Sequence, residues 1–264
     1  MTGAGRRAGI GFAIAKRLSD RDAPHMVIER TVEAFGAVDA LVVNHASPST
    51  PHAGQAVYTR GFLSVYDALV YGFNSPVLWR CPKARLVEHY DANVSARHLD
   101  IGVGTGALLD ACHFPAAAPE ITLMDLNPNS LAAASRRLAR YAPRTHRANV
   151  LEDWRLEPGT YESVALTHIL HCLPGSMAEK GVAFAHARRV LAPGGTLFGA
   201  TILAKDVHLS PLARAFTALS NHRGILHNWD DAPAELDAAL AATFPERQIL
   251  LHGTVALFTA RAPR

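Results

Sequence analysis

The feature that most constrains the fold of this chain is a short, mostly apolar run with an acid near its end, followed at once by glycines. Residues 98–106 read HLDIGVGTG, so Asp100 stands just before Gly102, Gly104 and Gly106. Alternating glycines let a backbone turn sharply, and they leave no side chain in the way of a ligand. The segment therefore predicts a strand, a glycine turn and a helix, which together form the opening unit of a parallel sheet with crossover helices.

The rest of the chain from Ala96 repeats this alternation of strand-like and helical patterns. Strands are predicted over residues 97–101, 121–125, 147–151, 163–168 and 196–201. Helices are predicted over residues 107–112, 129–141, 179–191 and 234–243. The last segment, ERQILLHGTVALFTARA, contains two strand-like runs broken at Gly253, which predicts an antiparallel hairpin at the sheet edge. We therefore expect an α/β fold: a Rossmann-like, seven-stranded, mostly parallel sheet with helices on both faces, an antiparallel C-terminal hairpin and an N-terminal appendage.

The spacing of the glycines alone is also compatible with a dinucleotide-binding loop. The order of the neighbouring motifs is more informative: Asp125 ends the next apolar run, a corner with the sequence NVLEDW follows at 149–154, and a Pro-Gly-Gly turn stands at 193–195. Together these motifs resemble the class I S-adenosylmethionine-dependent methyltransferases of the small-molecule type. The resemblance implies S-adenosylmethionine as the cofactor.

The same resemblance implies the roles of individual residues. It places Asp100 near the methionine ammonium, Asp125 on the ribose hydroxyls, and residues of the 149–154 corner around the adenine. Tyr66 and Trp79, with Asp67 and Arg80, are loosely similar to a helical cap found in quinone-biosynthesis C-methyltransferases, although simple packing explains them equally well. The predicted cofactor contacts are Asp100, Gly102, Val103, Gly104, Gly106, Asp125, Leu126, Asn149, Leu151, Glu152, Asp153, Tyr66 and Trp79.

Two histidines are the candidate catalytic residues. His168 ends the fourth predicted strand, where ligands of open α/β sheets bind, and His171 follows one helical turn later. A neutral imidazole can deprotonate a phenol, hydroxyl or amine acceptor, but both side chains are also compatible with lining or packing roles. No carboxylate or thiolate converges with the two histidines, so no metal site is predicted. The segment 204–233 is the expected acceptor lid, with candidates His208, Phe216, Asn221, His227, Asn228 and Trp229.

The first fifty residues resemble pieces of a short-chain dehydrogenase/reductase. Its glycine loop is matched by Gly3, Gly9, Ile10 and Gly11, and its structural asparagine by Asn44. The chain departs from this family in three respects. We expect the glycine loop to lack its preceding strand, and the stretch between Gly11 and Asn44 is shorter than the family requires. The family's catalytic tyrosine is followed four residues later by lysine, and no tyrosine of this chain has that spacing. The interpretation is a truncated fragment over 1–50, a linker and helical cap over 51–95, and the methyltransferase core over 96–264; a helical appendage with accidental glycines is the alternative.

Composition narrows the function further. The net charge of +3 is small and scattered, which argues against a nucleic-acid partner, and no apolar run is long enough for a membrane span or a signal peptide. The cysteines Cys81, Cys112 and Cys172 stand far apart, which favours the reducing cytoplasm over a disulfide framework. The predicted function is methyl transfer from S-adenosylmethionine to a small-molecule acceptor of secondary metabolism, with the oligomeric state left open. An NAD(P)-dependent oxidoreductase and a non-methylating S-adenosylmethionine-binding protein are the alternatives.

Overall fold

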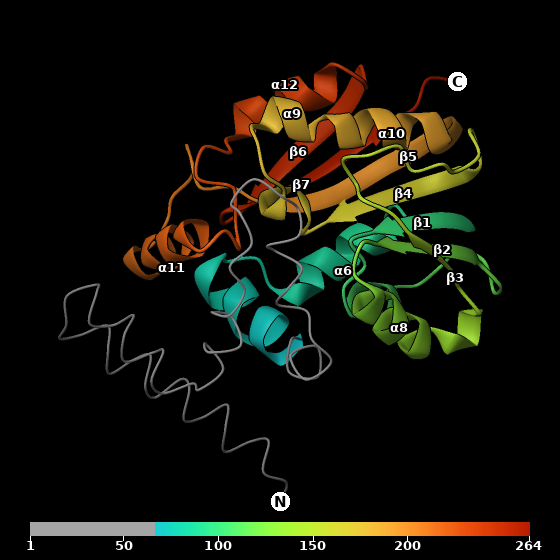
Figure 1. Cartoon of the computed structure of the whole chain (residues 1–264), viewed down its shortest axis with the longest axis horizontal. Helices are drawn as coiled ribbons and strands as arrows, with labels where there is room; N and C mark the ends of the chain where they lie inside the picture. The colour runs from blue at the N-terminus through green and yellow to red at the C-terminus, as the bar shows by residue number, and fades with distance from the viewer. Residues whose placement is uncertain (1–66) are drawn as a thin grey trace, which may run out of the picture.

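The computed structural model describes residues 67–264, and a seven-stranded sheet forms its centre (Figure 1). Its strands stand in the order β3-β2-β1-β4-β5-β7-β6. Their bounds are β1 Arg97–Ile101, β2 Glu120–Asp125, β3 Arg144–Arg147, β4 Tyr161–Thr167, β5 Leu191–Ile202, β6 Glu246–His252 and β7 Val255–Arg261. Strands β1 to β5 pair in parallel, whereas β7 pairs antiparallel with both β5 and β6. The Rossmann-like sheet and its C-terminal hairpin are therefore confirmed.

Helices cover both faces of this sheet. Their bounds are η1 (a π-helix) Val70–Leu78, α6 Lys83–Asp91, α7 Ala107–Ala111, α8 Pro128–Arg137, α9 Met177–Lys180, α10 Val182–Val190, α11 Pro211–His222 and α12 Pro233–Ala241. Short 3-10 turns add η2 Ala139–Tyr141 and η3 Leu170–Cys172. Figure 1 shows α9, α10 and α12 above the sheet and α6 and α8 below it. Both faces of the central strands are consequently buried, as expected for a parallel sheet.

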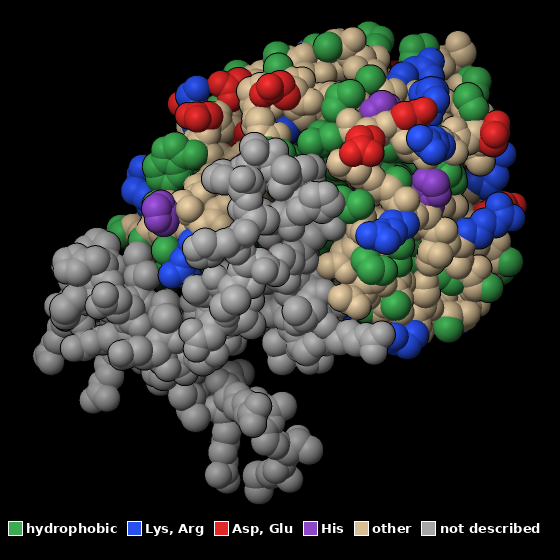
Figure 2. Space-filling model, viewed as in Figure 1, with side chains coloured by type: hydrophobic (Ala, Val, Ile, Leu, Met, Phe, Trp, Pro, Cys, Tyr) green, Lys and Arg blue, Asp and Glu red, His purple; other side chains and the backbone are tan. Residues whose placement is uncertain are grey.

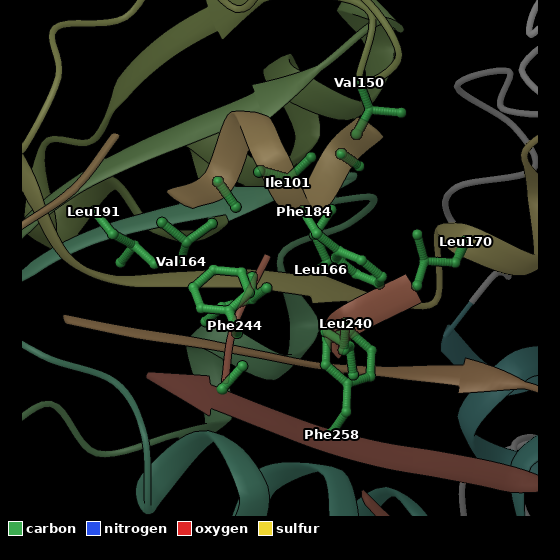
Figure 3. Packing of buried hydrophobic residues seen from close by; sticks show 14 of the residues in the cluster. Ile101, Val150, Val164, Leu166, Leu170, Phe184, Leu191, Leu240, Phe244 and Phe258 are labelled. Carbon is green, nitrogen blue, oxygen red and sulfur yellow. The ribbon is translucent and has the colours of Figure 1, made fainter. Parts of the chain in front are cut away.

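Two clusters of buried apolar side chains correspond to the two faces. One joins β4 and β7 to α10 and α12, and Figure 3 shows Val164, Phe184, Leu240 and Phe258 meeting there. The other joins the opposite face of the strands to η1, α6, α7, α8 and α11. Successive strand residues alternate between the clusters because neighbouring side chains of a strand point to opposite faces. The ends of the strands are thereby fixed in space, which positions the loops that follow them.

The helix after β2 starts at a side-chain cap. Asn127 Oδ1 accepts a hydrogen bond of 2.8 Å from the N–H of Asn129, and Pro128 occupies the first helical position. A side-chain oxygen at this place satisfies a backbone N–H that has no partner inside the helix, and proline is preorganised for it. The cap holds the turn between β2 and α8, where Asp125 stands.

Strand β3 lies earlier in the chain than the sequence predicts. The predicted range of 147–151 is wrong, because the strand covers Arg144–Arg147 and pairs with the second half of β2. Its sequence, RTHR, carries no apolar alternation, since β3 is an edge strand with mostly exposed side chains. The apolar pattern that suggested a strand at 147–151 came instead from Val150, which lies in the loop after β3 and whose side chain is buried.

Two helix predictions also need correction. The range 179–191 is two helices, since α9 ends at Lys180 and α10 begins at Val182, and Leu191 already belongs to β5. The predicted helix 129–141 divides in the same way into α8 and the 3-10 turn η2. Proline usually breaks a helix, yet Pro76 lies inside η1, where the N–H of Trp79 donates to the carbonyl of Asn74. This wide π-type turn accommodates the proline ring that a regular α-helix excludes.

The surface of the described region is of mixed charge. Figure 2 shows Lys and Arg side chains interspersed with Asp and Glu side chains over the visible face. Within residues 67–264, no helix is both long and apolar enough to cross a membrane. Three predicted features lie outside the described residues: the dehydrogenase-like fragment with Gly3, Gly9, Ile10, Gly11 and Asn44, the linker, and Tyr66.

Candidate functional site

A cavity opens at the carboxyl ends of β1, β2 and β4. Ligands of open α/β sheets bind in this position, because the loops after the strands diverge there. The side chains and backbone that line it are Tyr71, Tyr90, Asp100, Ile101, Gly102, Val103, Gly104, Thr105, Gly106, Leu108, Leu109, Met124, Asp125, Leu126, Ser130, Ala148, Asn149, Val150, Thr167, His168, Ile169, Cys172 and Leu173.

The structure brings together eight of the predicted cofactor contacts in this cavity. They are Asp100, Gly102, Val103, Gly104, Gly106, Asp125, Leu126 and Asn149. His168 lines the same cavity. Residues from the ends of four strands, β1 to β4, widely separated in the sequence, therefore surround one space.

The glycine turn after β1 forms one wall of the cavity. Gly102 has a φ of +68°, and a Cβ added there would lie 2.6 Å from Cδ1 of Ile169. Gly106 has a φ of +73° and would bring a Cβ within 3.2 Å of the Cβ of Ala134 in α8. Positive φ values are unfavourable for residues with a side chain, so both the conformation and the lack of space require glycine.

Asp125 closes the end of β2 and is held by two backbone N–H groups. The N–H of Asn127 donates to Oδ1 at 2.8 Å, and the N–H of Gly104 donates to Oδ2 at 3.4 Å. Burial raises the pKa of Asp125 from 3.8 to about 6, and the two hydrogen bonds oppose this rise. The carboxyl group is therefore mostly ionised at neutral pH, and it faces the cavity.

Asp100 provides the second carboxylate of the cavity. It is 4% exposed, and its Oδ2 accepts a hydrogen bond of 2.9 Å from the phenol of Tyr90 in α6. His98 Nε2 lies 3.5 Å from the same oxygen. Burial and the neighbouring carboxylate raise the pKa of Tyr90 well above its usual value, so the phenol keeps its proton and acts as a donor.

Several predicted contacts lie away from the cavity. Glu152 and Asp153 are exposed: Glu152 accepts a hydrogen bond from the amide of Asn149, and Asp153 forms an ion pair with Arg189 of α10. Leu151 packs against the apolar cluster of α10 and α12. Trp79 is buried and packs edge-on against Phe216, with the ring centroids 5.6 Å apart.

The first described residue is tied to the glycine turn. Asp67 accepts a hydrogen bond of 2.6 Å from the hydroxyl of Thr105 and lies 2.7 Å from the guanidinium of Arg137. Arg137 also donates to the Thr105 hydroxyl at 3.0 Å. The segment that precedes the core thus reaches the edge of the cavity through a polar contact.

His168 faces the cavity from the end of β4 in an unusual backbone conformation. Its φ is +58°, which costs energy for a residue with a side chain, and its N–H donates to the carbonyl of Ala200 at 2.7 Å. Nε2 is buried and has no hydrogen-bond partner among the described residues. The ring stacks on Tyr71, with the centroids 6.4 Å apart. Burial lowers the pKa of His168 to about 4, so the imidazole is neutral at physiological pH.

His171 lies behind His168 and does not line the cavity. The two ring centroids are 5.6 Å apart. The Nδ1 atom of His171 accepts a hydrogen bond of 3.2 Å from the N–H of Ile202 in β5. Burial lowers the pKa of His171 well below its usual value. The geometry makes His171 a buried link between η3 and β5 and leaves His168 as the histidine that a ligand can reach.

The segment 204–233 is fastened to the core and does not line the cavity. Lys180 is fully buried, and its Nζ contacts both oxygens of Asp231 at 2.8 Å and the carbonyl of His227 at 2.7 Å. Asn228 pairs with Asn221 and donates to the carbonyl of Ile202 at 3.0 Å. Of the predicted lid residues, Trp229 is 45% exposed. In the described region this segment is thus a packed extension of the sheet beside the cavity.

No group of His, Cys, Asp and Glu side chains within residues 67–264 is arranged to hold a metal ion. The cavity instead combines two carboxylates, a glycine turn and apolar walls, which suit a ligand with hydroxyl groups, a positive charge and a flat base. Comparisons with known proteins identify that ligand.

A methyltransferase-domain family model matches residues 99–197. Demethylluteothin O-methyltransferase of Streptomyces thioluteus is 47% identical over 207 residues, which cover 78% of this chain and 90% of that protein. The chain belongs to the S-adenosylmethionine-dependent methyltransferase family. The Physcion biosynthesis cluster O-methyltransferase of Aspergillus chevalieri is 33% identical, with 80% of this methyltransferase and 96% of that protein covered. The DhpI–S-adenosylhomocysteine complex has a TM-score of 0.57 at 17% identity, covering 83% of this chain and 100% of that one, and shows the same fold.

The cofactor of the methyltransferase is therefore S-adenosylmethionine, as the glycine turn and the acids predicted. The residues of the cavity fit it: each of the two carboxylates has protein partners that fix it and faces the cavity beside the glycine turn. Sequence reasoning missed Tyr71, Tyr90 and Cys172, which also line the cavity. None stands in a recognisable motif, and only the packing of η1, α6 and η3 brings them to the strand ends.

Proposed function

We propose that this methyltransferase transfers the methyl group to a hydroxyl oxygen of a small, flat acceptor of secondary metabolism. The observation that carries the proposal is His168, which lines the cavity and whose neutral imidazole has a buried Nε2 without a hydrogen-bond partner among the described residues. In the tautomer of the neutral ring that carries its proton on Nδ1, Nε2 is an acceptor for an O–H group. The names of the related O-methyltransferases of Streptomyces thioluteus and Aspergillus chevalieri support oxygen as the acceptor atom.

The cofactor contacts belong to the same proposal. S-adenosylmethionine supplies a methyl group on a positively charged sulfur. We assign Asp100 to the ammonium of its amino-acid part and Asp125 to the ribose hydroxyls, since ionised carboxylates accept strong hydrogen bonds from both kinds of group. Leu126 and Val150 provide apolar walls for the adenine, and the side chain of Asn149 provides polar contacts at the same corner.

The acceptor side of the cavity is aromatic and apolar. Tyr71 lies parallel to His168 within 20°, and Ile169, Cys172 and Leu173 continue the lining. A flat, conjugated acceptor is complementary to these walls, because aromatic rings favour offset stacking and burial. A phenol or enol combines this shape with an acidic hydroxyl group.

His168 orients the acceptor and takes its proton. The hydroxyl group donates to Nε2, and this directs an oxygen lone pair toward the methyl group. With S-adenosylmethionine bound, the oxygen–carbon bond would form as the carbon–sulfur bond breaks, and S-adenosylhomocysteine would leave. The proton of the hydroxyl group would pass to Nε2 of His168, from which solvent would remove it. The low pKa keeps the ring ready to accept before each turnover.

The test is turnover with a panel of phenols, enols, amines and thiols, followed by detection of S-adenosylhomocysteine and of the methylated product by mass spectrometry. We expect products with phenols or enols, and His168→Ala should lower kcat by a hundredfold or more with an unchanged Kd for S-adenosylhomocysteine. His222→Ala, at the exposed end of α11, is the matched control and should retain activity.

Two outcomes contradict the proposal. Methylation confined to nitrogen or sulfur acceptors would refute the acceptor atom, and full activity of His168→Ala would refute the role of the imidazole. Binding of S-adenosylmethionine without turnover across the whole panel would favour a non-methylating protein.

We also propose that the reaction takes place in the cytoplasm. Cys81, Cys112 and Cys172 are all free thiols, which suits the reducing cytoplasm. The proposal assigns no part of this chemistry to the dehydrogenase-like residues 1–50.

A further inference from the structure

His98 is a fully buried polar side chain that the proposed reaction does not use. It stands in β1 two residues before Asp100, so both side chains point to the same face of the strand. Its ring stacks on Phe198 at 5.8 Å and meets the edges of Tyr90 and Phe114 at 6.5 and 6.1 Å. Buried polar groups need hydrogen-bond partners, so the position of its two nitrogens is informative.

One ring nitrogen of His98 is paired with a serine of the neighbouring strand. Nδ1 lies 2.8 Å from the Oγ of Ser163 in β4. The same Oγ accepts a hydrogen bond of 2.9 Å from the N–H of Ser95. Because a serine hydroxyl has a single proton and the backbone N–H occupies one of its lone pairs, its proton is available for Nδ1. When the serine hydroxyl donates to Nδ1, a ring with one proton carries that proton on Nε2.

The other ring nitrogen points at the carboxylate of Asp100. Nε2 lies 3.5 Å from Oδ2, and it has no hydrogen-bond partner in the part of the chain that the structure describes. Tyr90 donates to the same oxygen at 2.9 Å. Both protein contacts thus fall on Oδ2, and within residues 67–264 no hydrogen bond reaches Oδ1.

We infer that His98 is a positioning residue for Asp100, with Ser163 fixing its tautomer. The phenol of Tyr90 donates to Oδ2, the Nε2 side of His98 packs against the same oxygen at 3.5 Å, and Oδ1 is directed at the ammonium of the cofactor. The inference rests on the proposed binding of that ammonium by Asp100. A rigid carboxylate loses little freedom when it binds, so its affinity for the amino-acid part of the cofactor rises.

His98 could position Asp100 or could only fill space in the core, and binding of two ligands distinguishes these roles. S-adenosylhomocysteine carries the amino-acid part, whereas 5′-methylthioadenosine shares the adenosine and the thioether but has no ammonium. Loss of the contact to Asp100 should weaken binding of the first ligand only. A general loss of packing should weaken both.

The test uses two substitutions of His98, in each of which a side-chain amide takes the place of one ring nitrogen. In His98→Gln the amide nitrogen takes the place of Nε2 and can still donate to Asp100, whereas the shorter side chain of His98→Asn reaches only the position of Nδ1. We expect His98→Asn to raise the Kd for S-adenosylhomocysteine tenfold or more and to change that for 5′-methylthioadenosine less than twofold. His98→Gln should stay within threefold of the unmodified protein for both ligands.

Ser163→Ala provides a second variant that removes tautomer control without touching the histidine. It should raise the Kd for S-adenosylhomocysteine threefold or more and leave binding of 5′-methylthioadenosine unchanged. Parallel losses for both ligands, or unchanged binding of S-adenosylhomocysteine in His98→Asn and Ser163→Ala, would overturn the inference. An unmodified protein that binds neither ligand would instead overturn the proposed function, and the inference with it.

Discussion

Replacement of Asp125 by asparagine should stabilise the free protein and at the same time weaken cofactor binding. Burial raises the pKa of this carboxyl group from 3.8 to about 6. Each unit corresponds to about 1.4 kcal/mol, so the ionised group costs the folded protein about 3 kcal/mol above pH 7. Water in the open cavity screens part of this cost. Asparagine keeps the acceptor for the N–H of Asn127 and loses the long contact of 3.4 Å to Gly104. The net gain should be about 1 to 2 kcal/mol at pH 8.

The gain should depend on pH in a definite direction. The folded-state pKa of Asp125 lies above the unfolded one, so its cost is fully present above about pH 6 and disappears as the pH falls toward 3.8. The advantage of Asp125→Asn should therefore shrink by about 1 kcal/mol between pH 8 and pH 5. Cofactor binding should instead become weaker, by about 3 kcal/mol or roughly a hundredfold, because the variant loses the two charge-assisted hydrogen bonds that we propose between Asp125 and the ribose.

Urea unfolding at pH 5, 6 and 8 measures the stability, and calorimetric titration with S-adenosylhomocysteine measures the affinity. Asp153→Asn is the control, since this exposed carboxylate lies outside the cavity and the backbone N–H of Arg155 and the neighbouring Arg189 lower its pKa. It should neither stabilise the protein at pH 8 nor change the affinity. An Asp125→Asn protein that is less stable than the unmodified one at pH 8, or whose advantage is independent of pH, would refute the reasoning.

Three further substitutions test other parts of the structure. Gly102→Ala should abolish cofactor binding in titration calorimetry, because its Cβ would lie 2.6 Å from Ile169 and its φ is +68°; an unchanged Kd would contradict this. Lys180→Met leaves Asp231 buried without its cation and should cost about 3 to 5 kcal/mol in urea unfolding, whereas combining it with Asp231→Leu should restore more than half of that loss. Ser176→Ala removes the capping box of α9 and should cost about 1 kcal/mol by the same measurement; a loss below a few tenths would argue against the cap.

The fold was predictable from the sequence wherever apolar residues are buried on both faces of a strand. Strands β1, β2 and β4 are such runs, and their predicted positions agree with the structure to within two residues. Strand β3 was not found, because an edge strand with the sequence RTHR buries almost nothing and carries no apolar pattern. The break at Gly181 was also missed, since the pattern of apolar residues continues from α9 into α10.

The site was predictable where a motif fixes a residue to the end of a strand. Asp100, Asp125 and His168 belong to this class, because a parallel sheet brings its carboxyl ends to one edge. Tyr71 and Tyr90 reach the cavity from helices whose packing no local pattern encodes. For His98 a signal existed: a histidine within a strand of a doubly covered sheet must be buried, and a buried imidazole needs partners.

The position of β7 has a consequence for the synthesis of this protein. Strand β7 is the last described strand in chain order, yet it lies between β5 and β6, and the N–H of Thr254 beside it donates to the carbonyl of Trp79 at 3.0 Å. Strands β1 to β5 therefore leave the ribosome while one edge of β5 is still unpaired. The carbonyl of Trp79, at the end of η1, also lacks its hydrogen bond until the hairpin of β6 and β7 has formed. A bare strand edge invites pairing with other chains until residues 255–261 arrive. The described sheet is completed only when β7 has been translated, so the yield of the enzyme in a cell depends on how long the edge of β5 stays unpaired.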